Sequence, residues 1–164
     1  MTLPRPDGEA WIFTVQPLSL GFHRRLREHG VTAPFAPVRL ARDSAGRPLR
    51  DAAGVVVTTT DAADPQFVEQ LEQYHQRVAV LAVAEALQVD PQVSFEARPP
   101  AADAPYGAWC DYADALYAEL ESAGFSAGDL ILFCDAIARL SNLIGDHLQQ
   151  ARSNFSSQPV IDSR

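Results

Sequence analysis

The sequence contains no lysine, and only two of its 164 residues are cysteine. Because Cys110 and Cys134 both fall on the apolar stripes of expected helices, we expect buried, unpaired thiols rather than a disulfide or a nucleophile. No apolar run approaches the roughly 20 residues of a membrane span, and the first residues lack the apolar core of a signal peptide. These absences predict a cytoplasmic protein that makes no contact with a membrane.

The sequence also lacks the motifs of common catalytic and cofactor sites. GxGxxG, GxxxxGK[ST], HExxH and CxxC are all absent. The segment 43–54 has the length of a calcium loop but not its alternating oxygen ligands. An enzyme would need a site built from scattered residues, such as Cys110, His75, His147 and Asp111. We therefore predict no catalytic site, no metal and no cofactor, and retain a small Cys/His/Asp enzyme as the alternative.

Charge is spread unevenly along the chain. The sequence has thirteen arginines and 21 acidic residues, which gives a net charge of −8. Residues 1–60 hold eight arginines and five acids, whereas residues 61–164 hold five arginines and sixteen acids. Since phosphate binding requires a cationic face, the acidic body argues against nucleic acid as the main ligand. The one basic patch is His23-Arg24-Arg25-Leu26-Arg27, either a solvated helix face with Leu26 turned inward or a dock for an acidic partner.

The clearest signal is a pair of helices, expected over residues 106–123 and 127–152. Apolar residues recur at three- and four-residue steps in both segments, which places them on one stripe of each helix. The first stripe comprises Trp109, Tyr112, Ala113, Leu116 and Leu120; the second comprises Leu130, Phe133, Cys134, Ile137, Leu140, Ile144 and Leu148. The two stripes predict an antiparallel helical hairpin that packs on the rest of the chain or on a partner.

The turn between these helices carries its own signals. Gly124 stands where the first helix should stop, because glycine takes the left-handed conformation without a steric penalty. Ser126 followed by Asp129 is typical of an N-cap with an acid three residues later, at the positive end of the helix dipole. We therefore predict positive φ at Gly124 and a capped second helix.

The N-terminal part of the sequence predicts short strands around one short helix. Residues 11–15 form an apolar run rich in β-forming residues, and Ser19 is expected to cap a helix that ends at His29 before Gly30. Residues 38–42 could be extended, and residues 55–60 give the strongest β signal of the chain. We expect a small sheet or hairpin here, and we find no internal repeat.

A long central helix should follow, beginning at Asp64-Pro65, because proline at the first helical position loses no hydrogen bond. Its second half, residues 78–87, is almost entirely apolar and should lie in the core. Residues 93–96 could form a short strand, and residues 98–105 a stiff linker. The predicted fold is α+β and mainly α, with one domain over residues 1–152 (a strand and short-helix part at 1–62, the central helix at 63–90 and the hairpin at 106–152) and a flexible tail over 153–164.

Several segments together resemble the tail assembly chaperones of long-tailed (siphovirus-type) bacteriophages and prophages. These are Pro17-Leu18-Ser19 before a short helix, the Asp61–Phe67 entry into a long helix, and a helix that contains Trp109. The stretch Ser122–Leu130 leading to Ile137–Leu143 completes the pattern. The similarity covers most of residues 11–152.

The resemblance implies a function without catalysis. Members of that family bind the tape measure protein, a very long hydrophobic helical chain, keep it soluble, and help recruit tail tube subunits before they leave the finished tail. The implied partners are the tape measure and tail tube proteins, and self-association is possible. The expected partner-binding residues are Arg24, Arg25, Arg27, Trp109, Tyr112, Leu132 and Leu143. The third alternative is a helical adaptor protein unrelated to phage.

Overall fold

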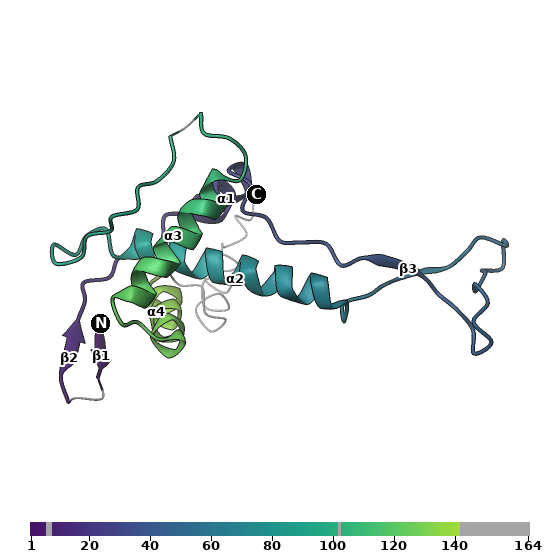
Figure 1. The fold of residues 1–164 in the computed structure, drawn as a ribbon, viewed down its shortest axis with the longest axis horizontal. Helices are drawn as coiled ribbons and strands as arrows, with labels where there is room; N and C mark the ends of the chain where they lie inside the picture. The colour runs from purple at the N-terminus through teal and green to yellow at the C-terminus, as the bar shows by residue number, and fades with distance from the viewer. Residues whose placement is uncertain (6–7, 102, 142–164) are drawn as a thin grey trace, which may run out of the picture.

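A computed structural model describes residues 1–5, 8–101 and 103–141. The fold is α+β and mainly helical, as expected (Figure 1). Two antiparallel pairs of strands accompany the helices. The elements in chain order are β1 (Thr2–Pro4), β2 (Ala10–Ile12), α1 (Phe22–Glu28), β3 (Val38–Leu40), β4 (Thr58–Thr60), α2 (Pro65–Ala86), α3 (Ala108–Ser122) and α4 (Ala127–Leu140).

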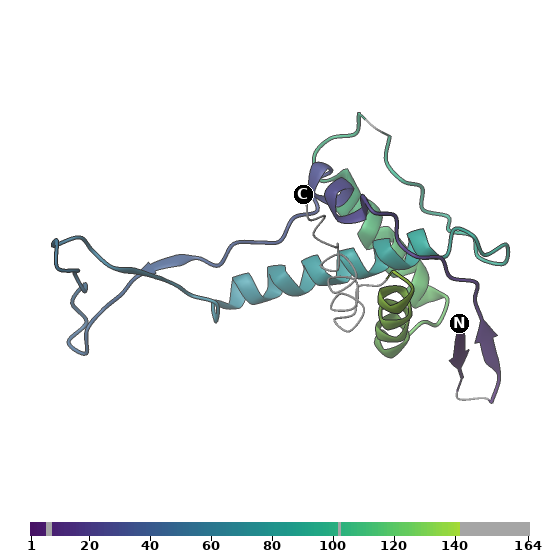
Figure 2. The ribbon, with the colours of Figure 1, turned by 180° about the vertical axis from the view of Figure 1, so that it is seen from behind.

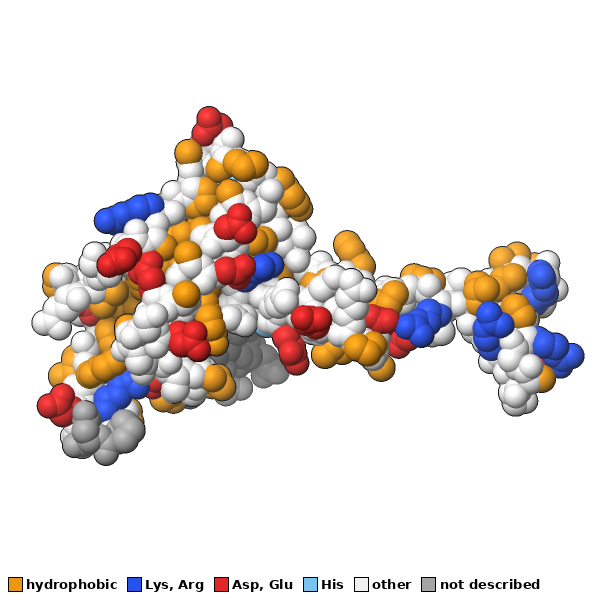
Figure 3. Space-filling model, viewed as in Figure 1, with side chains coloured by type: hydrophobic (Ala, Val, Ile, Leu, Met, Phe, Trp, Pro, Cys, Tyr) orange, Lys and Arg blue, Asp and Glu red, His pale blue; other side chains and the backbone are white. Residues whose placement is uncertain are grey.

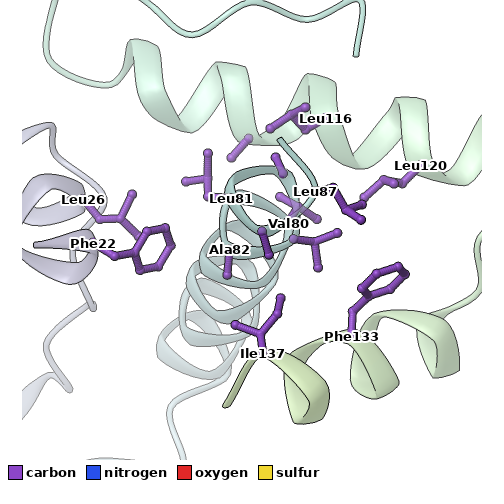
Figure 4. Close-up of a cluster of buried hydrophobic side chains, with 14 of the residues drawn as sticks. Phe22, Leu26, Val80, Leu81, Ala82, Leu87, Leu116, Leu120, Phe133 and Ile137 are labelled. Carbon is purple, nitrogen blue, oxygen red and sulfur yellow. The ribbon is translucent and has the colours of Figure 1, made fainter. Parts of the chain in front are cut away.

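The core forms around the C-terminal half of α2. Figure 4 shows side chains of α1, α3 and α4 approaching this half-helix from three different sides. The apolar run of α2 is buried as expected, and Val80 and Val83 are completely buried. The other elements contribute Phe22 and Leu26 from α1, Leu116 and Leu120 from α3, and Phe133 and Ile137 from α4. The expected bundle of the central helix and the two C-terminal helices is therefore present, but α3 and α4 each pack on α2 rather than against one another.

The start of α2 agrees with the sequence. The Asp64 carboxylate accepts hydrogen bonds from the backbone N–H groups of Gln66 and Phe67, and Pro65 occupies the first helical position. These bonds satisfy donors that a helix leaves free at its N-terminus. The first half of α2 contributes no buried side chain, and it projects from the body of the molecule (Figures 1 and 2).

The turn between α3 and α4 also follows the sequence. Gly124 has φ of +86°, and the N–H of Phe125 donates to the carbonyl of Leu120. Ser126 and Asp129 form the expected capping box, in which each side chain accepts a hydrogen bond from the other residue's backbone. α4 is described to Leu140, and the expected continuation to Arg152, with Ile144 and Leu148, lies outside the described residues.

The N-terminal elements differ in detail from the expectation. The regular strand covers residues 10–12 rather than 11–15, and it pairs with β1, which the sequence did not predict. The prediction that Ser19 caps α1 was wrong, since the N-cap position is Gly21 and has no side-chain hydrogen bond. Ser19 instead directs its backbone N–H and its hydroxyl to the Glu85 carboxylate of α2. A long-range acceptor therefore replaces the local cap.

Strands β3 and β4 pair as the expected hairpin, in a register that sets Val38 against Thr60 and Leu40 against Thr58. The hairpin belongs to an arm, defined here as residues 35–60, that extends along the direction of α2 away from the body (Figure 1). No residue in the range 32–79 is buried. The arm is thus held by its own hydrogen bonds rather than by a core.

The arm contains an internal repeat of eight residues, contrary to the sequence analysis. Asp43 and Asp51 begin equivalent turns, and in each turn the aspartate accepts backbone hydrogen bonds from the residues two and four places later. Ala41, Leu49 and Val57 close a ring in which each backbone N–H donates to a carbonyl of another, at 2.8–2.9 Å. The two copies share only a short segment, Arg-Asp-x-Ala-Gly at residues 42–46 and 50–54, which the sequence analysis overlooked.

Residues 93–96 do not form the expected strand. This segment belongs to a strap, residues 92–98, that is attached to α3 by its backbone. The N–H groups of Glu96 and Ala97 both donate to the carboxylate of Glu119. A side chain of α3 thus takes the place that a neighbouring strand would occupy.

Candidate partner-binding surface

Three of the seven expected partner-binding residues line one groove. Arg25, Trp109 and Tyr112 meet in a groove of about 740 Å³ between α1, the C-terminal half of α2, α3 and the strap. Its apolar wall includes Phe22, Leu26, Leu81 and Leu87. The structure therefore brings these three residues together from two helices that are far apart in the sequence.

Arg25 is engaged within the molecule, and its assignment to partner binding stays a prediction. Its guanidinium lies 2.5 Å from the Glu85 carboxylate and also donates to the hydroxyl of Ser19. Burial raises the pKa of Glu85, but the hydrogen bonds from Ser19 and Arg25 outweigh it and lower the pKa overall. Arg25 thus fixes α1 to α2.

The other two arginines of the basic patch point to solvent. Arg24 and Arg27 are exposed, whereas Leu26 between them is buried as expected. Arg24 lies 3.8 Å from Glu28 one turn later. Pairs of this kind at exposed positions contribute less than about 1 kcal/mol. Arg24 and Arg27 thus remain available to an acidic partner.

Trp109 and Tyr112 form the aromatic wall of the groove. Trp109 stacks on His29 with 4.7 Å between ring centroids and meets Tyr112 edge-on at 5.8 Å. The indole Nε1–H of Trp109 is buried and has no acceptor among the described residues. Burial raises the pKa of Tyr112. These half-buried rings were expected on the core stripe, and they lie at its edge because α3 begins here.

Helix α4 is apolar on both of its faces. Phe133 and Ile137 are completely or almost completely buried, while Ile131 is 69% exposed, Leu132 47% and Leu140 49%. At about 100° per residue, Ile131 and Leu132 lie on the outer face, on either side of Asp135 and Arg139. Leu140 lies on the inward stripe as expected, seven residues after Phe133, but it is the last residue of α4 and is half exposed. Leu143 lies outside the described residues.

A second hollow, which the sequence analysis missed, lies on the other side of the strap. It measures about 560 Å³ and is bounded by β2, the strap and the end of α3. Its wall carries the aromatic residues Trp11, Phe13, Phe95 and Phe125. The apolar run at residues 11–15 indicated a strand, but it could not show that this strand borders a hollow.

An ion pair anchors the N-terminal strands beside this hollow. Arg5 lies 2.7 Å from Asp129 of the α4 capping box, and both side chains are nearly buried. The same guanidinium lies over the Trp11 ring, 3.6 Å from its centroid. Since Trp11 in turn packs on Phe125 at 5.3 Å, the pair connects β1 and β2 to the hairpin turn.

Two residues of the alternative enzyme site, Cys110 and His75, border different hollows. Cys110 lines a small hollow with Tyr74 and Arg77, whereas His75 and Cys134 border a different one. Both cysteines are half-buried rather than buried, and burial raises the pKa of the Cys134 thiol. His147 lies outside the described residues. Within residues 1–5, 8–101 and 103–141, no three acidic, cysteine or histidine side chains are placed to hold a metal ion.

No helix among the described segments combines the length and the apolar character needed to cross a membrane. Comparison with protein-family models, with curated proteins and with solved structures gives no match. The geometry of the molecule therefore carries the functional argument.

Proposed function

We propose that this protein is a tail assembly chaperone of the cytoplasm, which holds the apolar helical tape measure protein in soluble form and helps recruit tail tube subunits. The observation that carries the proposal is the outer face of α4. It exposes two large aliphatic side chains, Ile131 and Leu132, on a helix whose opposite face is already packed.

An exposed aliphatic helix face suits another helix. A partner helix can lay its own apolar stripe against such a face, with contacts repeating at three- and four-residue steps. The face also carries the Asp135–Arg139 ion pair at 2.9 Å, so polar groups lie within reach of the partner's flanks. The Trp109–Tyr112 groove offers a second apolar contact on the molecule.

The affinity should come mainly from burial of apolar surface. Binding should then show a negative heat-capacity change that persists at high salt. Arg24 and Arg27 should add a steering contribution that salt removes. The net charge of −8 would keep the complex from aggregating.

The test is co-expression with the tape measure protein encoded beside this chain. We expect that protein in the soluble fraction only when this chain is present, and a complex that survives size-exclusion chromatography. Equal solubility of the partner without this chain would overturn the proposal.

A matched pair of variants locates the surface. Leu132→Asp should return the partner to the insoluble fraction, because it replaces an aliphatic contact of the α4 outer face by a charge. Val68→Asp changes an aliphatic residue of similar exposure, 39%, on α2, and should leave the partner soluble. Equal effects of the two variants would rule out α4 as the binding face.

A further inference from the structure

Strand β2 presents a backbone edge to the second hollow. Hydrogen bonds connect Met1 with Phe13 and Arg5 with Glu9. Because bonded and non-bonded pairs alternate in an antiparallel ladder, the N–H and C=O groups of Ala10 and Ile12 point away from β1. The Thr14 N–H continues the same edge and donates to the Asp90 carboxylate at 2.6 Å.

The strap forms the facing wall of the hollow. Asp90 links the two walls, since its other carboxylate oxygen accepts from the N–H of Gln92 at 2.9 Å. Residues 92–95 line the hollow opposite β2 without pairing with it as a strand. The Glu119 carboxylate holds the strap in place through residues 96 and 97. Two stretches of backbone therefore border one elongated space.

The chemistry of the walls restricts the ligand. Aromatic and aliphatic side chains form most of the lining, and the volume of about 560 Å³ lies within the usual range for ligand sites, about 300–1,000 Å³. The one charged residue of the lining is a carboxylate, Glu119. Glu9, Glu96 and Glu121 directly adjoin lining residues in the sequence. An apolar segment with basic flanks is complementary to this site.

We propose that a partner protein inserts an extended apolar segment, flanked by basic residues, into this hollow and adds a strand to the free edge of β2. The backbone of the segment bonds to Ala10 and Ile12, and its alternate side chains enter the aromatic wall. This site is separate from the α4 face, and the inference does not depend on the proposed function.

The probe is the acetylated and amidated peptide RVTVTR. We expect it to bind, to protect the Ile12 amide from hydrogen exchange, and to shift the emission of Trp11 in a Trp109→Phe background, where Trp11 is the sole tryptophan. A peptide methylated on its four central backbone nitrogens should lose at least tenfold in affinity. The same peptide with glutamate flanks should also bind at least tenfold more weakly.

Two protein variants complete the test. Ile12→Pro removes the N–H that faces the hollow and should weaken binding at least tenfold, whereas Thr2→Pro alters the outer edge of β1 and should leave binding unchanged. Failure of RVTVTR to bind at millimolar concentration, or equal binding of the methylated peptide, would overturn the proposal. Self-association of the chain that Ile12→Pro abolishes and RVTVTR competes would assign the edge to a second copy instead.

Discussion

Asp129 combines two roles in a single side chain. It completes the α4 capping box by accepting hydrogen bonds from the backbone N–H and the hydroxyl of Ser126, and it pairs with Arg5. Burial raises the pKa of its carboxyl group, but the hydrogen bonds from Ser126 and Arg5 have the larger effect and leave this pKa below its usual value. The charged form is therefore the one that stabilises the fold.

The lowered pKa predicts a loss of stability in acid. A depressed carboxyl pKa contributes stability that is present above the unfolded value of about 3.9 and is lost as the pH falls through the folded value. Asp129→Asn should cost about 3–5 kcal/mol at neutral pH, because it leaves Arg5 nearly buried without its partner. Denaturant unfolding at several pH values measures both effects.

The control for this variant is Asp135→Asn. Asp135 forms an exposed pair with Arg139, which should contribute less than about 1 kcal/mol. If Asp129→Asn lowered the free energy of unfolding no more than Asp135→Asn does, the ion pair between Arg5 and Asp129 would not stabilise the fold.

Gly124 and Gly128 provide a matched pair on the same turn. A Cβ at Gly124 would meet only Trp11, at 3.9 Å, so the cost of Gly124→Ala comes from its φ of +86°. We expect a loss of about 1 kcal/mol. Gly128 lies within α4 at ordinary φ, and Gly128→Ala should stabilise by up to about 1 kcal/mol. Thermal unfolding of both variants measures the difference, and equal shifts would contradict the role of the left-handed conformation.

At the scale of elements, the two faces of the C-terminal hairpin should respond differently to truncation. Leu116→Ala and Ile137→Ala should each cost about 2–5 kcal/mol, since both side chains are almost completely buried and leave a cavity. Ile131→Ala, at 69% exposure, should cost less than about 1 kcal/mol. Chemical denaturation measures all three. A loss below about half a kcal/mol at both buried sites would show that the stripe does not form the core.

The sequence predicted those elements whose signals are local. The capping box of α4, the Asp64-Pro65 start of α2 and the left-handed Gly124 each depend on a few adjacent residues, and all are present. The errors occur where a distant group takes a backbone donor. Ser19 bonds to Glu85, and the strap bonds to Glu119.

The candidate binding surface was only partly predictable for the same reason. Periodicity placed Trp109 and Tyr112 on one stripe with Leu116, but it could not show that the stripe leaves the core at its N-terminal end. It also could not assign Arg25 to Glu85, 60 residues later. The hollow beside β2 needs the tertiary placement of three segments, which no local pattern reveals.

At the scale of the whole molecule, charge and shape divide the chain into two parts. The arm carries four arginines and two aspartates, a net charge of +2, whereas the other described residues carry seven arginines and sixteen acids, a net charge of −9. Figure 3 shows basic side chains at the far end of the arm and acidic ones over the body. Among the ion pairs between described residues, Arg42 and Arg50 take part in none. Both instead donate to glycine carbonyls of the two repeated turns.

The arm should be dispensable for the stability of the body. Replacing residues 42–56 by Asn-Gly would join Ala41 to Val57, which already share a hydrogen bond of 2.9 Å, through a two-residue turn that suits a hairpin. The melting temperature should change by no more than a few degrees, because the deleted segment contains no buried residue and contributes little apolar burial. Circular dichroism during heating measures this. A destabilisation as large as that of Leu116→Ala would show that residues 42–56 are coupled to the core. In the intact chain, we expect the amides of this segment to exchange fast, as in the least stable part of a fold.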